Sequence, residues 1–197
     1  MLAETTITGS YLFGLEGFIV IAIIVALSLA VTKFSKKVSS KYLIEKIEQL
    51  DQTTYRHIAN VPFKQLDQKI DHLVLSTYGI FIIERENFNG KISGDQFDSN
   101  WILQTKKEHQ TIANPIANLT AKIGPIAKEL NIQEKYLYPI VAFSNSTDLE
   151  VEQKLINKSV ANYDQINEAI QFYKTPKISK EKIAELIALL ETMKRKK

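Results

Sequence analysis

The first concentration of apolar residues along the chain predicts a membrane-spanning helix. Residues 11–34, YLFGLEGFIVIAIIVALSLAVTKF, hold one acid, Glu16, followed by an uncharged run from Gly17 to Thr32. The stretch from Tyr11 to Thr32 would form a helix of about 33 Å at ~1.5 Å per residue, enough to cross a hydrocarbon core of ~30 Å. We therefore expect a transmembrane helix at 11–34, preceded by an extracytoplasmic N-terminus at 1–10.

The charges around this stretch predict its orientation. The charged side chains before the uncharged run are both acidic, Glu4 and Glu16. Five lysines follow the run, Lys33, Lys36, Lys37, Lys41 and Lys46. Cytoplasmic flanks are rich in lysine and arginine, so the N-terminus is expected outside and the main domain in the cytoplasm of a single-pass cell-membrane protein. Two other interpretations stay open: a signal peptide cleaved near Ser28-Leu29-Ala30, which lacks a basic start, and a buried core helix.

The period of the apolar pattern then changes from helical to alternating. Residues 37–51 have helical spacing within a basic juxtamembrane segment, 35–52. Residues 53–104 read as an antiparallel meander of about five strands, TYRHIANV, KIDHLVLS, GIFIIER, KISGD and NWILQ. Asn89-Gly90 is typical of a tight hairpin between the third and fourth of these strands.

The second half of the chain alternates helices and buried strands. NPIANLTAKIGPIAKEL predicts a helix kinked at Gly124-Pro125, and the apolar YLYPIVAF predicts a strand buried on both faces. SVANYDQINEAIQFY reads as a short strand and a helix, and a last helix begins near Ser179. We expect an α/β (α+β) fold in which a mixed sheet with an antiparallel meander is flanked by helices, with a domain at 53–175 and a C-terminal helix with a basic tail at 176–197.

Composition removes several kinds of chemistry. The chain has no cysteine, which excludes disulfides and thiolate zinc sites. Its three histidines, His57, His72 and His109, are far apart in sequence and lack the HExxH spacing of a histidine zinc site. The net charge of +3 is too small to imply a partner by itself.

Acidic residues on two predicted neighbouring strands are the main candidates for chemistry. Asp71 interrupts the apolar strand IDHLVL, and Glu84 and Glu86 share one face of FIIERE. Two or three carboxylates with water are what Mg²⁺ or Mn²⁺ prefers. Such an ion, with a lysine close by, stabilises the charge that develops on a phosphodiester.

The stretch IDHLVLSTYGIFIIERENFNGKISGD…NWILQ resembles the nuclease-related domain (NERD), a branch of the PD-(D/E)XK nuclease superfamily with a restriction-endonuclease-like core. The resemblance runs from about Tyr55 to Phe143 and includes the Asn-Pro pair at 114–115 and the later strand PIVAFS. It implies a metal-dependent nuclease of DNA or RNA in which Asp71 and Glu84 are catalytic and bind the metal ion.

Three positions depart from the family pattern. The family's Glu-x-Lys is Glu84-Arg85-Glu86, its Gly-Glu pair aligns with Ser39-Ser40, and the glutamine of its NPxxQ helix is Asn118. Glu45 or Glu48 could supply the missing helical acid. Lys69, two residues before Asp71, is a candidate for the catalytic lysine, and Glu86 for a third metal ligand. Strand alternation should point Arg85 away from Asp71.

Simpler roles stay open for the same residues. Asp71 could pair with Lys69 or Lys91, Glu86 could be solvated charge at a strand end, and Trp101 could be a core anchor rather than a stacking platform. The C-terminal KRKK could be a solvated tail or could contact lipid or phosphates. Whether the protein is an enzyme is therefore open: the alternatives are a degenerate nuclease-fold module that binds nucleic acid or a protein at the membrane, and a domain that only docks a partner.

Overall fold

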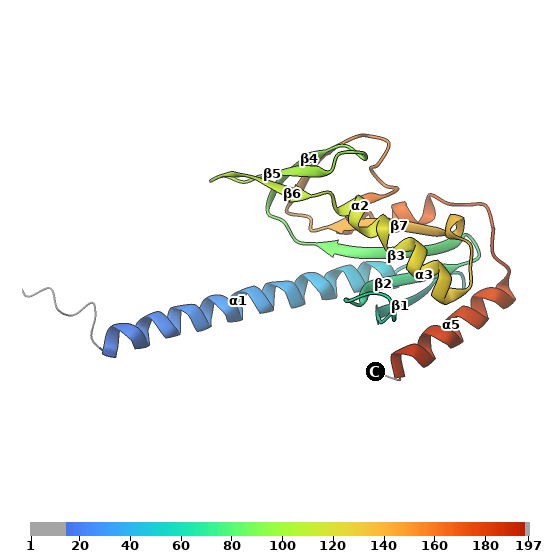
Figure 1. Cartoon of the computed structure of the whole chain (residues 1–197), viewed down its shortest axis with the longest axis horizontal. Coiled ribbons are helices and arrows are strands. Elements are labelled where there is room, and N and C mark those ends of the chain that lie inside the picture. Colours follow the sequence, from blue (N-terminus) through green and yellow to red (C-terminus); the bar gives the residue numbers. More distant parts are fainter. Residues whose placement is uncertain (1–14, 196–197) are drawn as a thin grey trace, which may run out of the picture. The chain divides into compact units, whose positions relative to one another are not determined.

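The computed structural model describes the backbone of residues 15–195 and, within that range, the side chains outside 15–16 and 31–39 (Figure 1). The predicted extracytoplasmic segment 1–10 and the last two residues of the basic tail lie outside the described residues. The chain divides into two compact units, one ending at Ser39 and one running from Ser40 to Lys197. Helix α1, Leu15–Glu48, contributes to both.

The prediction of a transmembrane helix at 11–34 is wrong. In the part of the chain that the structure describes, no helix has the length of apolar sequence that a membrane crossing requires. The predicted single-pass membrane localisation, with its outside N-terminus and cytoplasmic domain, rested on this helix and is therefore not supported.

A five-stranded mixed sheet forms the centre of the second unit, in the order β1-β2-β3-β7-β9. The first three strands are antiparallel, and β3, β7 and β9 are parallel. Its strands are β1 Arg56–Val61, β2 Ile70–Ser76, β3 Gly79–Glu86, β7 Leu137–Phe143 and β9 Val160–Asn162. The apolar runs in β2, β3 and β7 arise because these three strands are buried on both faces.

Helices cover both faces of this sheet (Figure 1). On one face Leu73, Leu75 and Ile82 pack with residues of α2, α3 and α5, and on the other Phe81 and Ile83 pack with the end of α1 and with α4. The helices are α2 Pro115–Ala121, α3 Ile123–Leu130, α4 Ile166–Gln171 and α5 Lys180–Arg195, with 3₁₀ turns at Glu134–Tyr136 and Tyr163–Gln165.

A second, four-stranded mixed sheet corrects the predicted single sheet. Its order is β6-β5-β4-β8, and its strands are β4 Gly90–Gly94, β5 Asn100–Gln104, β6 His109–Ala113 and β8 Thr147–Val151. The predicted meander 53–104 is therefore divided between two sheets, and β6 and β8 were not predicted. Trp101 of β5 is fully buried, which confirms its role as a core anchor.

The predicted hairpin at Asn89-Gly90 is also wrong, because β3 and β4 belong to different sheets. Both strands pair in parallel with the same later segment, β3 with β7 and β4 with β8. The residue offset is identical in the two sheets, as Ile83↔Ile140 and Ile92↔Leu149 show. Gly90 nevertheless needs to be glycine: its φ is 147°, and a Cβ would lie 2.4 Å from the carbonyl oxygen of Gln104.

Hydroxyl groups hold the crossover between the two sheets. Ser144 and Thr147 donate hydrogen bonds to the carbonyl oxygen of Phe88, at 3.1 and 2.7 Å. The backbone N–H of Ser144 donates to the carbonyl of Glu86 at 3.0 Å. These contacts satisfy backbone groups that a strand ladder would otherwise pair, and they fix the end of β3, where the candidate carboxylates lie.

Candidate functional site

The structure places Asp71 and Glu84 on adjacent antiparallel strands. His72 of β2 pairs with Ile83 of β3, so Asp71 and Glu84 occupy the next opposed positions of the same register. Asp71 is the one residue of β2 that is not buried, and the last three residues of β3 are partly exposed. The fold therefore brings the two predicted metal ligands to one edge of the buried sheet.

Asp71 is bound by Arg85, not by Lys69 or Lys91. One carboxylate oxygen accepts hydrogen bonds from the Arg85 backbone N–H at 3.0 Å and from Nε at 3.2 Å, and the other accepts from Nη2 at 3.2 Å. The prediction that Arg85 points away from Asp71 is wrong, because the carboxylate itself bonds to the Arg85 backbone and brings the guanidinium within reach. Bidentate arginine–carboxylate pairing fixes orientation as well as charge.

Glu84 is bound by Lys122, a residue that the sequence interpretation missed. The Lys122 ammonium donates to a Glu84 carboxylate oxygen at 2.5 Å, and both side chains are about three-quarters buried, with 27% and 22% exposure. Lys122 lies between α2 and α3, where the first helix ends and the second begins. The signal for it was a lysine on the apolar stripe of this helix pair, three residues after Leu119 and four before Ile126.

Glu86 is the third carboxylate of this cluster. Its partial burial raises the pKa of its carboxyl group, and the negative charges of Glu84 and Asp71 raise it further, whereas Lys122 lowers it. A carboxyl group in such surroundings holds its proton at a higher pH than a solvated one. Glu86 is thus more than a solvated strand end, because the charges of both Glu84 and Asp71 act on its carboxyl group.

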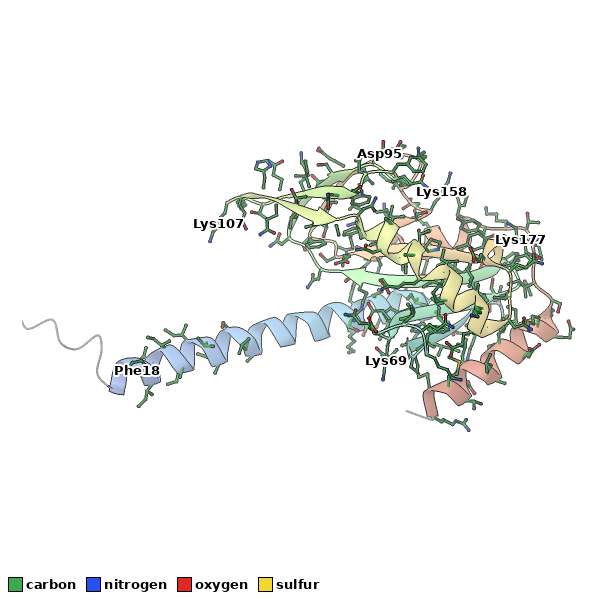
Figure 2. All side chains as sticks on the ribbon, in the orientation of Figure 1. Phe18, Lys69, Asp95, Lys107, Lys158 and Lys177 are labelled. Atoms are coloured by element: carbon green, nitrogen blue, oxygen red, sulfur yellow. The ribbon has the colours of Figure 1, made fainter. Side chains whose placement is uncertain are left out.

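The remaining predicted residues lie apart from the cluster. Lys69, labelled in Figure 2, is exposed. Among the described side chains, the hydrogen-bond and ion-pair partner of Asp71 is Arg85 and not Lys69. Glu45 pairs with Lys41 at 3.3 Å on the exposed side of α1. Glu48 and Asn118 are also exposed.

A divalent cation fits this donor set as a two-carboxylate site. No group of three histidine, aspartate or glutamate side chains among the described residues is arranged to hold a metal ion, so the predicted three-ligand set of Asp71, Glu84 and Glu86 is not assembled. Mg²⁺, however, commonly binds one or two carboxylates and takes its other ligands from water and phosphate. The chemistry of Asp71 and Glu84 meets that requirement.

Asn114 positions the helix that leads to Lys122. Its side-chain oxygen accepts hydrogen bonds from the backbone N–H groups of Ile116 and Ala117, and its amide donates to the carbonyls of Asp95 and Asp98 at 3.3 and 2.7 Å. The side chain is 1% exposed. It therefore caps α2 and ties the helix start to the loop between β4 and β5.

Substituting Asn114 should destabilise the domain strongly. We expect Asn114→Ala to lower the free energy of unfolding by about 2–3 kcal/mol, because it removes a helix cap and the amide hydrogen bonds to the loop carbonyls of Asp95, Gln96 and Asp98. Urea titration followed by circular dichroism measures this. Asn118→Ala, an exposed asparagine on the same helix, is the matched control, and equal stability of the two variants would contradict the assignment.

Comparison with known proteins agrees with the resemblance seen in the sequence. The nuclease-related domain family matches residues 36–144. No curated protein and no solved structure matches the chain. The matched segment is more than half of the chain, and it contains β2 and β3 with their carboxylates and the Lys122 junction. The chain therefore belongs to the nuclease-related domain family.

Proposed function

We propose that the protein is a metal-dependent nuclease that hydrolyses phosphodiester bonds of DNA or RNA, with its reaction centre at Asp71, Glu84 and Lys122. The observation that carries the proposal is the 2.5 Å ion pair between Lys122 and Glu84. It supplies a lysine beside the carboxylates, although the family's usual lysine position holds Glu86. Family membership supports a nuclease-like function in general.

Asp71 and Glu84 would hold Mg²⁺ or Mn²⁺. When bound, the ion would neutralise charge on the phosphoryl group and lower the pKa of a water molecule. Arg85 holds the Asp71 carboxylate in one orientation through three hydrogen bonds. In this proposal the Lys122 ammonium adds positive charge beside the phosphate, a contribution that typically amounts to several kcal/mol of transition-state stabilisation.

Glu86 is suited to carry a proton in the same reaction. Burial raises the pKa of its carboxyl group above the usual range, and the neighbouring carboxylates act in the same direction. An acid whose pKa is shifted toward the working pH is a better proton donor and acceptor. In the proposal Glu86 exchanges a proton with the attacking water or the leaving oxygen and does not serve as a third ligand.

Removal of divalent cations should abolish activity. We expect the purified full-length chain to cleave labelled DNA or RNA in Mg²⁺ or Mn²⁺ and to lose that cleavage when a chelator is added. The reason is that the two carboxylates are negatively charged, so a bound cation is needed to stabilise the charge of the phosphodiester. Gel electrophoresis of the products measures this. Re-addition of excess Mn²⁺ is the control and should restore cleavage, while cleavage that continues in chelator would contradict metal dependence.

A second candidate is a nuclease-fold module that binds nucleic acid without cutting it. The observation that favours it is charge neutralisation within the cluster. Asp71 already forms an ion pair with Arg85, and Glu84 already forms one with Lys122. A metal ion would have to compete with both cations. Stable binding of nucleic acid with no cleavage in either metal ion would support this function over the first.

A further inference from the structure

A row of aromatic rings with lysines at both ends lies at the end of the central sheet opposite to the carboxylates. Tyr138 and Tyr173 stack with their ring centroids 3.9 Å apart, and Phe172 meets Tyr173 edge-on at 5.3 Å. Lys158 Nζ lies 4.6 Å from the Phe172 centroid. At the other end Lys177 Nζ lies 5.4 Å from the Tyr138 centroid and donates to the Tyr138 hydroxyl at 2.7 Å.

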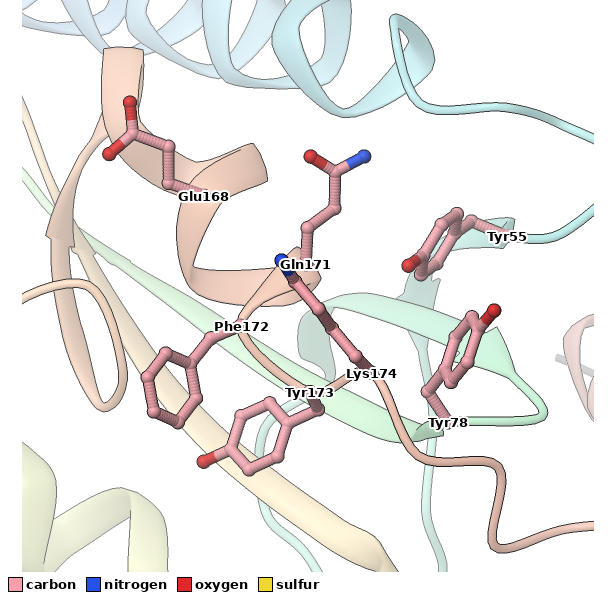
Figure 3. A pocket seen from close by; sticks show the side chains of 7 residues that line it. All are labelled: Tyr55, Tyr78, Glu168, Gln171, Phe172, Tyr173 and Lys174. Atoms are coloured by element: carbon pink, nitrogen blue, oxygen red, sulfur yellow. The ribbon is translucent and has the colours of Figure 1, made fainter.

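Phe172 and Tyr173 of this row line an open pocket of about 730 Å³. Figure 3 shows Tyr55 and Tyr78 on one side, Phe172 and Tyr173 on the other, and Lys174 between them. Its volume lies in the range of ligand-binding pockets. The walls therefore offer flat apolar faces, and the charged group between them is a cation.

Tyr55 belongs to the hydrophobic core, and Tyr78, Tyr138 and Tyr173 are partly buried against it, but packing within the core does not account for Phe172 or the lysines. Phe172 remains 50% exposed although it contacts Tyr173. Lys158 and Lys177, both labelled in Figure 2, place ammonium groups beside rings at the two ends of the row. The acid of the pocket wall, Glu168, accepts a hydrogen bond from the Asn157 side chain at 3.0 Å. The surface thus combines one exposed ring, Phe172, and the partly buried ring of Tyr173 with an excess of positive charge.

We propose that this aromatic and lysine surface binds single-stranded nucleic acid. Unpaired bases stack on aromatic side chains whatever their sequence, and lysines beside them contact the phosphates. In a duplex the bases are paired and stacked on one another, so their faces cannot reach Phe172 or Tyr173. Tyr78 immediately precedes β3 and lies six residues before Glu84, about 20 Å in extended chain. The surface is therefore separate from the proposed reaction centre and does not depend on cleavage.

Fluorescence anisotropy of the full-length chain tests the proposal. The probes are labelled oligodeoxythymidine and oligouridine of about 20 nucleotides, longer than the ~4–16 nucleotides of a single-strand binding fold, in chelator to prevent cleavage. We expect Phe172→Ala to weaken binding about tenfold, because it removes one stacked base. Phe97→Ala is the matched control: Phe97 is 84% exposed with Lys154 Nζ 5.6 Å from its ring centroid, and its loss should leave affinity unchanged.

Further measurements sharpen the result. Lys174→Ala should reduce the slope of log affinity against log salt by about 0.7, the value for one phosphate of a single strand. Because binding is measured in chelator, its outcome does not depend on cleavage, which separates this proposal from the nuclease. No binding of either oligonucleotide, an unchanged affinity of Phe172→Ala, equal binding of duplex, or competition by thymidine monophosphate as strong as by the oligonucleotide would each overturn it.

Discussion

Lys122→Met should reduce nuclease activity by about 10²–10³-fold with little change in substrate binding. The ammonium of Lys122 is the cation that contacts Glu84, at 2.5 Å. Removal of a preorganised charge that acts on the transition state lowers kcat by this order. Methionine has a similar length and leaves the apolar stem of the side chain in place. Single-turnover cleavage at saturating substrate measures the effect.

The control for this variant is Lys128→Met. Lys128 lies on α3, the helix that follows Lys122, and is exposed, so its substitution removes an equal charge nearby without touching the carboxylates. Thermal unfolding of both variants separates lost chemistry from lost structure, since an unpaired Glu84 also costs stability. Wild-type turnover by Lys122→Met would show that Lys122 is not the lysine of the reaction.

The protein should lose about 4 kcal/mol of unfolding free energy between neutral pH and about pH 5, through two histidines. His57 Nε2 and His72 Nδ1 lie 3.0 Å apart between β1 and β2. Burial lowers the pKa of His57 to about 4 and that of His72 to about 3, and the charges of Lys194 and of the histidine partner act in the same direction. The second ring nitrogen of His72, Nε2, is buried without a hydrogen-bond partner.

The sign follows from the proton count of the two states. Below about pH 6.5 the unfolded chain binds protons at both histidines, whereas the folded chain does not until about pH 3–4, so stability is complete above about 6.5 and falls as the pH is lowered. Each pH unit in this window costs about 1.4 kcal/mol per histidine. Urea titrations at the two pH values measure the difference.

The matched variants test which histidines are responsible. His57→Gln combined with His72→Gln should remove most of the pH dependence, while His109→Gln on the exposed strand β6 should leave it intact. A wild-type protein that is as stable at about pH 5 as at neutral pH would contradict the account of the buried pair.

Much of the fold was predictable because its signals are local. The apolar runs of β2, β3 and β7 gave three strands at nearly their observed bounds, and Asn114-Pro115 marked the start of α2. The break in the next helix came at Lys122, just before the predicted Gly124-Pro125. Strands and helices whose own sequence is typical of their conformation could thus be predicted without knowledge of their neighbours.

Pairing between distant strands could not be read in this way. Asn89-Gly90 is a strong hairpin signal, but the parallel pairing of β4 with β8 and the hydroxyl contacts to Phe88 decide the path of the chain. The exposed hairpin strand β6 has little apolar pattern, and all but one of its residues face solvent. The apolar run at 11–34 predicted a membrane helix from sequence alone, but no helix among the described residues is long and apolar enough to cross a membrane.

In the candidate site, too, contacts between neighbouring strands were predictable from the sequence and a long-range contact was not. Asp71 and Glu84 were expected together because their strands are consecutive and antiparallel, and the register agrees. Lys122 lies 38 residues from Glu84 in sequence, so no spacing rule connects the two. Arg85 was assigned to the wrong side of β3 because strict alternation holds for ideal strands. In this protein the Asp71 carboxylate of β2 accepts a hydrogen bond from the Arg85 backbone N–H of β3.

Cleavage by the full-length wild type and by Asp71→Asn, side by side in Mn²⁺, tests the central claim most directly. Asparagine keeps the size of Asp71 but removes its charge, so the account predicts cleavage of DNA or RNA by the wild type and a rate at least about 10²-fold lower for the variant. Absence of cleavage by the wild type on both substrates, or equal rates for the two proteins, would contradict it.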